Sequence, residues 1–205
     1  MIVIASQTGP QVVGDGSDPP LRSGRAGDLI VSELQGRYFE QASRGNTYNA
    51  SNQAAQAVSV ALATTYTGLC ISNPLGNTKN CVLLSASYAL TVAPAAIASL
   101  HLIGGYSATA NVTHTTPLVA PGIQNSLLGT GPTSTMRADS AATIVSPGYV
   151  MSLQGGFTAA ALPASPLAVL DLGGQIVLPP GAWIAIGALT AVTGFGSFSW
   201  VEVPV

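Results

Sequence analysis

Cysteine and histidine are the side chains here best suited to disulfide or metal chemistry, and the 205-residue sequence holds two of each. Cys70 and Cys81 flank a stretch whose centre, residues 74–77, has the composition of a turn. If these four residues form the loop of a hairpin, Cys70 lies directly opposite Cys81, and opposed positions can come within disulfide reach. A cytoplasmic origin favours free thiols instead. A disulfide and a packed pair of reduced cysteines therefore both stay open.

The two histidines show no spacing that would join them to the cysteines in a zinc site. His114 has no metal-ligating residue close to it in sequence, and neither has His101. His101 alternates with Ser99 and Ile103, which places all three on one face of a strand. Histidine in that setting is most often an ordinary packed side chain. The sequence therefore predicts no metal site.

The acidic side chains form no convincing catalytic pair. Glu33 and Glu40 could in principle act together as the two carboxylates of a glycosidase. Arg37 lies between them at a predicted hairpin turn, and salt bridging on that hairpin is the simpler interpretation. Asp15 and Asp18 lack the spacing of a calcium-binding loop.

Signatures of nucleotide binding and serine hydrolysis are also missing. Residues 74–79 lack the Gly-Lys-Ser/Thr ending of a phosphate-binding loop, and they lie between predicted strands rather than before a helix. The sequence contains no Gly-x-Ser-x-Gly elbow. It therefore predicts a protein that is not an enzyme and binds no cofactor.

The chain is 47% hydrophobic but only 7% charged, whereas about 25% charged residues is typical of a soluble domain. Interfaces between permanent partners are similarly poor in charge, so the composition predicts a subunit of a larger assembly. The net charge of −2 argues against a nucleic-acid partner. No run approaches the roughly 18 apolar residues of a membrane-spanning helix. The start of the chain lacks signal-peptide features, so we expect no membrane partner and synthesis in the cytoplasm.

Charge divides the chain into an N-terminal region, residues 1–45, and a body, residues 46–205. Nine of the fourteen charged residues lie in the first region. Residues 8–27 are rich in Gly, Pro, Ser and Asp, which predicts an extended arm. This arm either lies along a partner's surface or is a disordered tail. Residues 28–34 and 37–41, on either side of Gln35-Gly36, predict a β-hairpin.

Strand patterns dominate the body. Residues 80–92 alternate strictly, with one face made of Val82, Leu84, Ala86, Tyr88, Leu90 and Val92. Further strands are predicted, separated by Gly and Pro turns, at 64–72, 99–103, 149–153, 175–178, 183–188 and 195–203. Apolar residues on both faces of 195–203 indicate burial on both sides, inside the sandwich or at a subunit interface. Residues 50–61 fit a short helix or a strand equally well.

Many short strands with such turns are typical of all-β folds. The sequence predicts a jelly-roll-like antiparallel β-sandwich as the body, preceded by the extended N-terminal arm and the hairpin.

Several segments resemble landmarks of virion proteins that tailed bacteriophages encode among their head genes. Those of the N-terminal region and its junction with the body are Leu21-Arg-Ser-Gly-Arg-Ala-Gly-Asp-Leu-Ile, Gly36-Arg-Tyr-Phe-Glu-Gln and Arg44-Gly-Asn-Thr-Tyr-Asn-Ala-Ser-Asn-Gln. Those of the body are Asn73-Pro-Leu-Gly-Asn-Thr-Lys-Asn, Leu178-Pro-Pro-Gly-Ala-Trp and Trp200-Val-Glu-Val-Pro-Val. The resemblance covers most of the chain, and these landmarks carry no known chemistry.

Members of this size and β content resemble capsid decoration, or cement, proteins, which form trimers and clamp neighbouring capsomers. The resemblance implies a homotrimer on the capsid surface of the virion, made in the bacterial host cytoplasm and bound to the major capsid protein of the same phage. Arg22, Arg25 and Asp28 are the candidate capsid contacts, because arginine suits buried interface ion pairs. The alternatives are a head fibre, a tail-associated virion protein, or a receptor- or glycan-binding knob.

Overall fold

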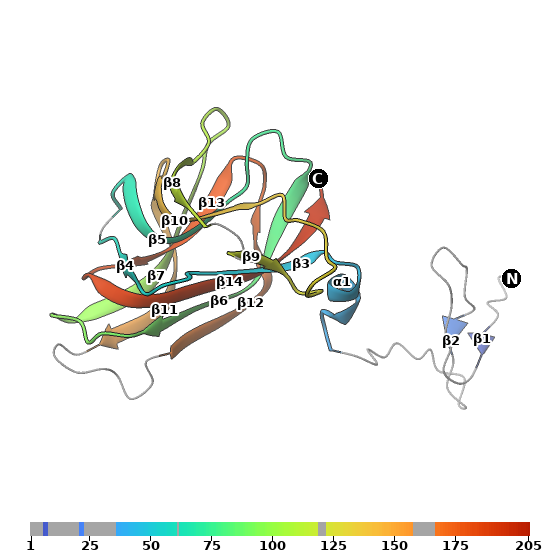
Figure 1. Ribbon diagram of the computed structural model, residues 1–205, viewed down its shortest axis with the longest axis horizontal. Helices are drawn as coiled ribbons and strands as arrows, with labels where there is room; N and C mark the ends of the chain where they lie inside the picture. The colour runs from blue at the N-terminus through green and yellow to red at the C-terminus, as the bar shows by residue number, and fades with distance from the viewer. Residues whose placement is uncertain (1–5, 8–20, 23–35, 61, 119–121, 158–166) are drawn as a thin grey trace, which may run out of the picture. The chain divides into compact units, whose positions relative to one another are not determined.

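The computed structural model (Figure 1) describes residues 6–7, 21–22, 36–60, 62–118, 122–157 and 167–205. The chain divides into two compact units, Met1–Phe39 and Glu40–Val205. In the first unit, β1 (Ser6–Gln7) pairs in parallel with β2 (Leu21–Arg22). The rest of the predicted arm, and the first strand of the predicted hairpin, lie outside the described residues.

The prediction of a strand at residues 37–41, the second of the hairpin, is wrong. Residues 37 and 38 form a turn, and the chain then enters a short helix, α1 (Phe39–Ser43). Gly45 ends the helix with a φ of 72°, a left-handed conformation that glycine adopts without strain. The Gly45 carbonyl accepts a hydrogen bond of 2.6 Å from Asn125 Nδ2, which ties the end of the helix to the body.

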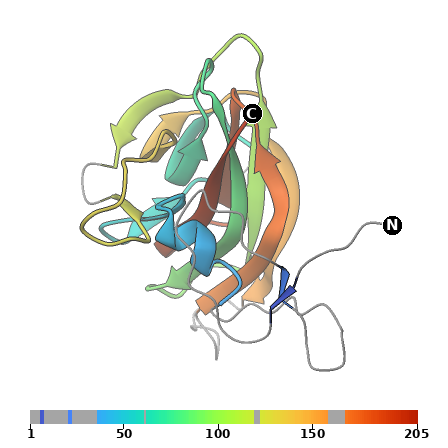
Figure 2. The ribbon, with the colours of Figure 1, turned by 90° about the vertical axis from the view of Figure 1, so that its right-hand side faces the viewer.

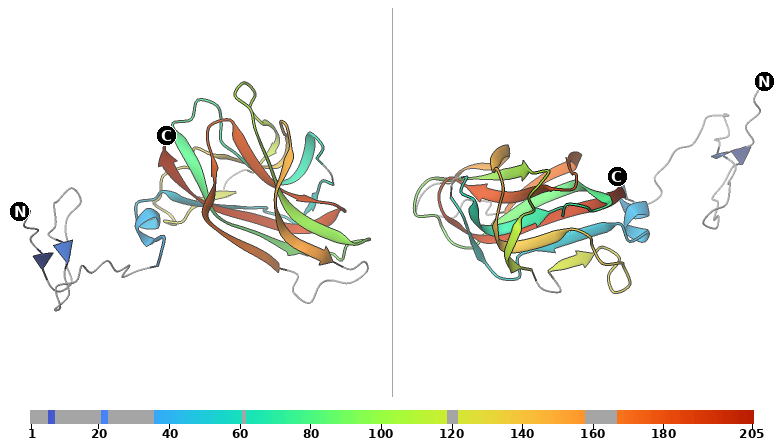
Figure 3. Two further views of the ribbon diagram at one scale, coloured as in Figure 1. Left: turned by 180° about the vertical axis from the view of Figure 1, so that it is seen from behind. Right: turned by 90° about the horizontal axis from the view of Figure 1, so that it is seen from above.

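The body is a sandwich of two antiparallel sheets, seen face to face in Figures 2 and 3. Sheet I has the order β11-β7-β13-β5-β10-β8, with bounds β5 (Thr65–Ser72), β7 (Ala98–Tyr106), β8 (Thr113–Pro117), β10 (Arg137–Thr143), β11 (Gly148–Phe157) and β13 (Ala182–Ala188). Sheet II has the order β12-β6-β14-β3-β9, with bounds β3 (Thr47–Ser51), β6 (Lys79–Leu90), β9 (Ile123–Asn125), β12 (Leu167–Leu178) and β14 (Val192–Pro204). A short strand, β4 (Gln56–Val58), also pairs with β14.

The predicted all-β class and most of the predicted strands are confirmed. Each predicted strand of the body overlaps an observed one, because period-two alternation between turn residues is a strong local signal. Residues 50–61, which fitted a helix or a strand, contain the end of β3 and all of β4. Strand β12 runs through Gly173-Gly174, where a turn was expected. Both glycines have positive φ, and they form a bulge between Asp171 and Ile176.

The strict alternation predicted for residues 80–92 holds only in part. Ser199 pairs with Ser85, but the next residue, Trp200, pairs with Leu83. Leu84 is therefore an extra residue in β6, which makes a β-bulge. Because of it, the residues of β6 before Leu84 project to the opposite side of the sheet from the one that strict alternation predicts. Cys81 and Leu83 consequently point into the core together with the buried Ala86, Tyr88 and Leu90.

The main core fills the space between the sheets. Its largest members are Trp200, Phe198, Tyr48, Tyr88, Leu69, Ile71, Leu83, Leu100 and Leu102. A second, smaller core lies on the other side of sheet I and contains Tyr66, Cys70, Ile103, Val112, Ala142, Ile144, Trp183 and Ala185. Val112 and Ile144 come from connections outside the strands. The central part of sheet I is therefore covered on its outer face too, whereas Tyr149 on β11 is half exposed.

Candidate functional site

The predicted hairpin between the cysteines is wrong. Cys70 lies in β5 of sheet I, and Cys81 lies in β6 of sheet II, so they do not oppose each other. The intervening chain crosses between the sheets, with Asn73 Nδ2 donating to the carbonyls of Lys79 and Leu178, each at 2.9 Å. Both thiols are free and buried. Burial raises the pKa of each thiol well above its ordinary value, and a nearby carboxylate adds to the shift.

The other predicted site residues lie in or near the N-terminal region. Arg22 belongs to β2, whereas Arg25 and Asp28 lie outside the described residues. Glu33 also lies outside them, and Glu40 lies in α1. No capsid contact or carboxylate pair can therefore be assigned from geometry.

His101 makes ordinary packing contacts, as predicted. Its Nε2 lies 2.8 Å from Ser99 Oγ, and its ring meets the Tyr149 ring edge-on with 5.3 Å between centroids. Within the described residues, no three His, Cys, Asp or Glu side chains come together as metal ligands would.

A histidine–carboxylate pair that sequence analysis missed lies at the edge of sheet I. His114 Nδ1, in β8, lies 2.8 and 2.7 Å from the two carboxylate oxygens of Asp139, in β10. Burial raises the pKa of Asp139, and the neighbouring His114 and Arg137 partly offset this. The only sequence signal was that Asp139 is one of few charged residues in the body.

This pair resembles two members of a catalytic triad, but neither of the two candidate nucleophiles beside it among the described residues, Cys70 and Ser140, is free to react. Cys70 pairs with Asp139 across the sheet, yet its side chain is fully buried. The hydroxyl of Ser140 donates to the Thr116 carbonyl at 3.2 Å. Nucleophilic catalysis needs an accessible nucleophile within reach of the base. The geometry instead tethers β8 to the sheet.

A second buried carboxylate, Glu202 in β14, is 2% exposed. It accepts hydrogen bonds from Ser134 Oγ at 2.5 Å, Thr135 N at 3.0 Å and Thr135 Oγ1 at 2.9 Å. Lys79 Nζ lies 3.3 Å away. A single acid within an apolar strand was the signal that could have identified it. The arrangement fastens the loop before β10 to sheet II.

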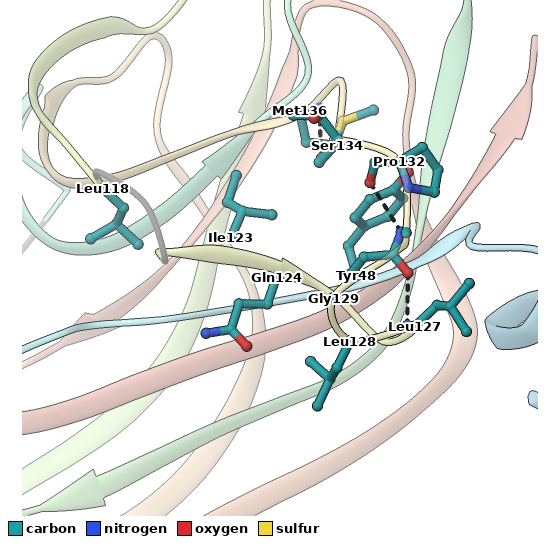
Figure 4. Close-up of a pocket in the computed structure, with 13 residues that line it drawn as sticks. Tyr48, Leu118, Ile123, Gln124, Leu127, Leu128, Gly129, Pro132, Ser134 and Met136 are labelled. Carbon is teal, nitrogen blue, oxygen red and sulfur yellow. Dashed lines mark hydrogen bonds between the residues drawn. The ribbon is translucent and has the colours of Figure 1, made fainter.

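A hollow of about 560 Å³ lies between β9 and that loop (Figure 4). Its walls are mixed: Leu118, Ile123, Leu127, Leu128 and Met136 contribute apolar groups, and Gln124, Thr133 and Ser134 contribute polar ones. Asn125 lines it too, but its amide already bonds to the carbonyls of Gly45 and Pro132 and to the amide of Leu127. Tyr48 forms part of the wall, and burial, with the charge of Glu202, raises its pKa. Among the residues that line the hollow, Tyr48 is therefore the one with an ionisable side chain.

The outer face of sheet II carries exposed side chains on β12 and β14. Cross-strand pairing arranges its side chains in three rows. The rows are Leu167, Ala89 and Phe195; Val169, Ser87, Ser197 and Ser51; and Asp171, Ser85, Ser199, Asn49 and Gln124. Residues paired in this way project to the same side of a sheet. Asp171 is the single charged residue in these rows.

Within the single chain β14 is not buried on both sides, so burial inside the sandwich is excluded and burial at a subunit interface stays a prediction. Phe195 is 38% exposed, whereas Phe198 and Trp200 on the opposite face are buried. On β12, Val169 is 65% and Leu167 is 51% exposed. The strand is therefore covered on its inner face and open over its first half on its outer face.

Charge is scarce over the whole body surface. Residues 46–205 contain only Lys79, Arg137, Asp139, Asp171 and Glu202 as charged residues. Asp139 and Glu202 are buried, and Lys79 is engaged with Glu202. Among the described residues, neither Arg137 nor Asp171 takes part in either of the two salt bridges of the body.

Comparison with known proteins adds no relative, since no family model, curated protein or solved structure matches the chain. Among the helices in the described part of the chain, none has the length and apolar character needed to cross a membrane. The fold and the open face of sheet II therefore carry the functional argument.

Proposed function

We propose that this protein is a non-enzymatic structural subunit of a tailed-phage particle, a trimeric decoration protein that binds across capsomer seams and stabilises the head. The observation that carries the proposal is the open, nearly uncharged face of sheet II. Its exposed apolar side chains, Leu167, Val169 and Phe195, lie among small uncharged ones, and such a surface is suited to protein–protein contact. A body with so few surface charges is poorly soluble unless part of its surface is covered.

The phage assignment is supported by the sequence landmarks given above and by the all-β body. A jelly-roll-like topology is supported by the last two strands, since β13 lies between β5 and β7 and β14 lies between β3 and β6. A protein that binds only the assembled shell stabilises it by mass action. No catalytic constellation is needed for that role.

Attachment to the capsid is assigned to the N-terminal region, with Arg22, Arg25 and Asp28 as contacts. Most of the charged residues lie there, and charged contacts give an interface its specificity. The core of the body draws on residues from Tyr48 onwards. Removal of residues 1–27 should therefore leave the fold and the oligomer intact while it weakens capsid binding.

The experiment has two parts. Size-exclusion chromatography with light scattering should give three times the mass of one chain, and a monomer at micromolar concentration would refute the assembly role. Co-sedimentation with undecorated capsids should then show binding of the full chain and reduced binding of the chain that lacks residues 1–27. Full-length protein that fails to sediment with capsids would refute the decoration role and leave the assembly role standing.

A further inference from the structure

We infer that the outer face of sheet II binds a second copy of this chain, with the β12 side of one copy against the β3–β9 side of the next. This inference rests on the proposed assembly and names the surface that builds it. Four features of the face support it: its shape, its internal hydrogen bonds, its size and its charge.

The two sides of the face differ in shape. On β12, Leu167 and Val169 form an exposed strip, which we call the apolar strip. On the other side is a hollow of about 290 Å³, here called the side hollow, lined by residues of β3, β9 and β14 and by the turns beside them, Asn49, Ala50, Ser51, Gln53, Gly122, Gln124, Leu128, Ser197, Phe198 and Ser199. Gln124 and Leu128 project toward this side in Figure 4, away from Ile123 and Met136. One copy therefore carries an exposed apolar strip at one side of the face and, at the other, a recess lined by both polar and apolar residues.

The polar side chains between strip and hollow already bond to each other. Ser87 Oγ lies 2.5 Å from Ser197 Oγ, and Ser199 Oγ donates to Asn49 Oδ1 at 2.6 Å. Ser51 Oγ donates to the Gly196 carbonyl at 3.1 Å. Burial of a polar group is costly chiefly when its hydrogen bonds are lost. This face can therefore be covered by another protein without leaving these hydroxyls unpaired.

The size of the face is appropriate for a stable contact. Strands β6, β12 and β14 are 12, 12 and 13 residues long. At ~3.3 Å per residue and ~4.8 Å between strands, the sheet presents on the order of 600 Å² in projection. Because β14 is open only over its first half, the uncovered part is smaller than this and supplies part of the about 800 Å² per partner that a stable interface buries.

Charge favours a second copy as the occupant. A surface that binds itself must not repel itself, and Asp171 is the one charged residue in the three rows. Asp171 Oδ1 accepts a hydrogen bond of 3.0 Å from the amide of Gly173, which holds the carboxylate beside its own bulge. A strip and a hollow at opposite sides of one face also allow each copy to bind two neighbours. Such a contact closes into a ring when the rotation permits, which is what a trimer requires.

Disulfide trapping tests this pairing directly. The double variant Val169→Cys/Gln124→Cys places one thiol on the strip and one beside the side hollow. Mild oxidation should link it into covalent dimers and trimers on a non-reducing gel, whereas each single variant should stay monomeric. The native Cys70 and Cys81 are buried, so the unmodified chain is the background control. An oligomer that persists while the double variant links no better than the single variants would overturn the inference.

A charge substitution provides an independent measurement. Val169→Lys should convert the oligomer to monomer in light scattering, because the new charge would be buried in the contact. Ala108→Lys, on an exposed loop between β7 and β8, should leave the oligomer unchanged. A wild-type monomer would refute the proposed assembly itself, whereas a wild-type oligomer unaffected by Val169→Lys would refute only this surface.

Discussion

Replacement of Glu202 by alanine should destabilise the body far more than removal of its cationic partner, Lys79. The Glu202 carboxylate is fully enclosed and is held by hydrogen bonds from Ser134 and Thr135 as well as by Lys79. The Lys79 side chain is 32% exposed, so water can hydrate its ammonium group when the carboxylate is absent. The two substitutions therefore remove different interactions.

The magnitude follows from those contacts. Hydrogen bonds to a charged group contribute about 1.5–3 kcal/mol each. Glu202→Ala removes the hydrogen bonds from Ser134 and Thr135. Because Thr135 is exposed and water can replace part of its loss, we count two bonds, a cost of about 3 kcal/mol. A partly exposed ion pair contributes about 1 kcal/mol or less, which is the expected cost of Lys79→Met. In a domain of this size each kcal/mol lowers Tm by roughly 2–4 °C. We therefore expect Glu202→Ala to lower Tm by roughly 6–12 °C and Lys79→Met to lower it by at most about 4 °C.

Thermal unfolding followed by circular dichroism measures both variants under the same conditions. Added salt should lower the Tm of the unmodified chain only slightly, since screening acts mainly on exposed pairs. Equal losses in Glu202→Ala and Lys79→Met would show that the ion pair, rather than the hydrogen bonds to the loop, holds this region. That result would refute the reasoning.

Three further predictions concern buried groups. Burial raises the pKa of Asp139 in the folded protein. The stability that the protonated Asp139 carboxyl contributes is therefore complete below its pKa in the unfolded chain, and it is lost as pH rises through its raised pKa in the folded protein. Asp139→Asn should remove this loss. In thermal melts across acidic pH, the Tm of the wild type should fall relative to that of the variant as pH rises. A rise of the wild-type Tm relative to the variant would contradict the raised pKa. Cys70 and Cys81 should react with a thiol reagent only after unfolding, with the same count with or without reductant, and fast reaction of the native protein would contradict their burial. Gly194→Ala should unfold or aggregate, because its Cβ would lie 2.1 Å from the carbonyl oxygen of Ala89. Gly36→Ala should leave the stability unchanged, because no atom lies within 4 Å of the added Cβ. Equal stability of the two variants would contradict the packing at β14.

Local patterns in the sequence predicted the strands of the body well but not the pairing between distant residues. Alternation marked β6 and β14 because each strand segment reports which of its faces is buried. The bulge that turns Cys81 inward depends on the register with β14, more than a hundred residues later, and no local pattern reports it. The hairpin predicted around residues 74–77 failed for the same reason, since the link between β5 and β6 changes sheets rather than returning along one.

The candidate sites were harder to predict than the strands. The low charge of the body indicated a contact surface, but which face stays open depends on how loops cover the sandwich. The Asp139–His114 and Glu202–Lys79 pairs each join residues that are far apart in sequence. Scarcity of charge was the one local signal for both, because a charged residue in an otherwise apolar strand needs a partner when buried.

The small second core over sheet I has a consequence for how far association can proceed. A sandwich with two bare faces can stack face on face without limit, as layered β-structures do in fibrils. Here Trp183, Tyr66 and Ile144 occupy one of those faces from within the same chain. Face-on stacking of the body through the centre of sheet I is therefore blocked, because these side chains are already packed against residues of the same chain.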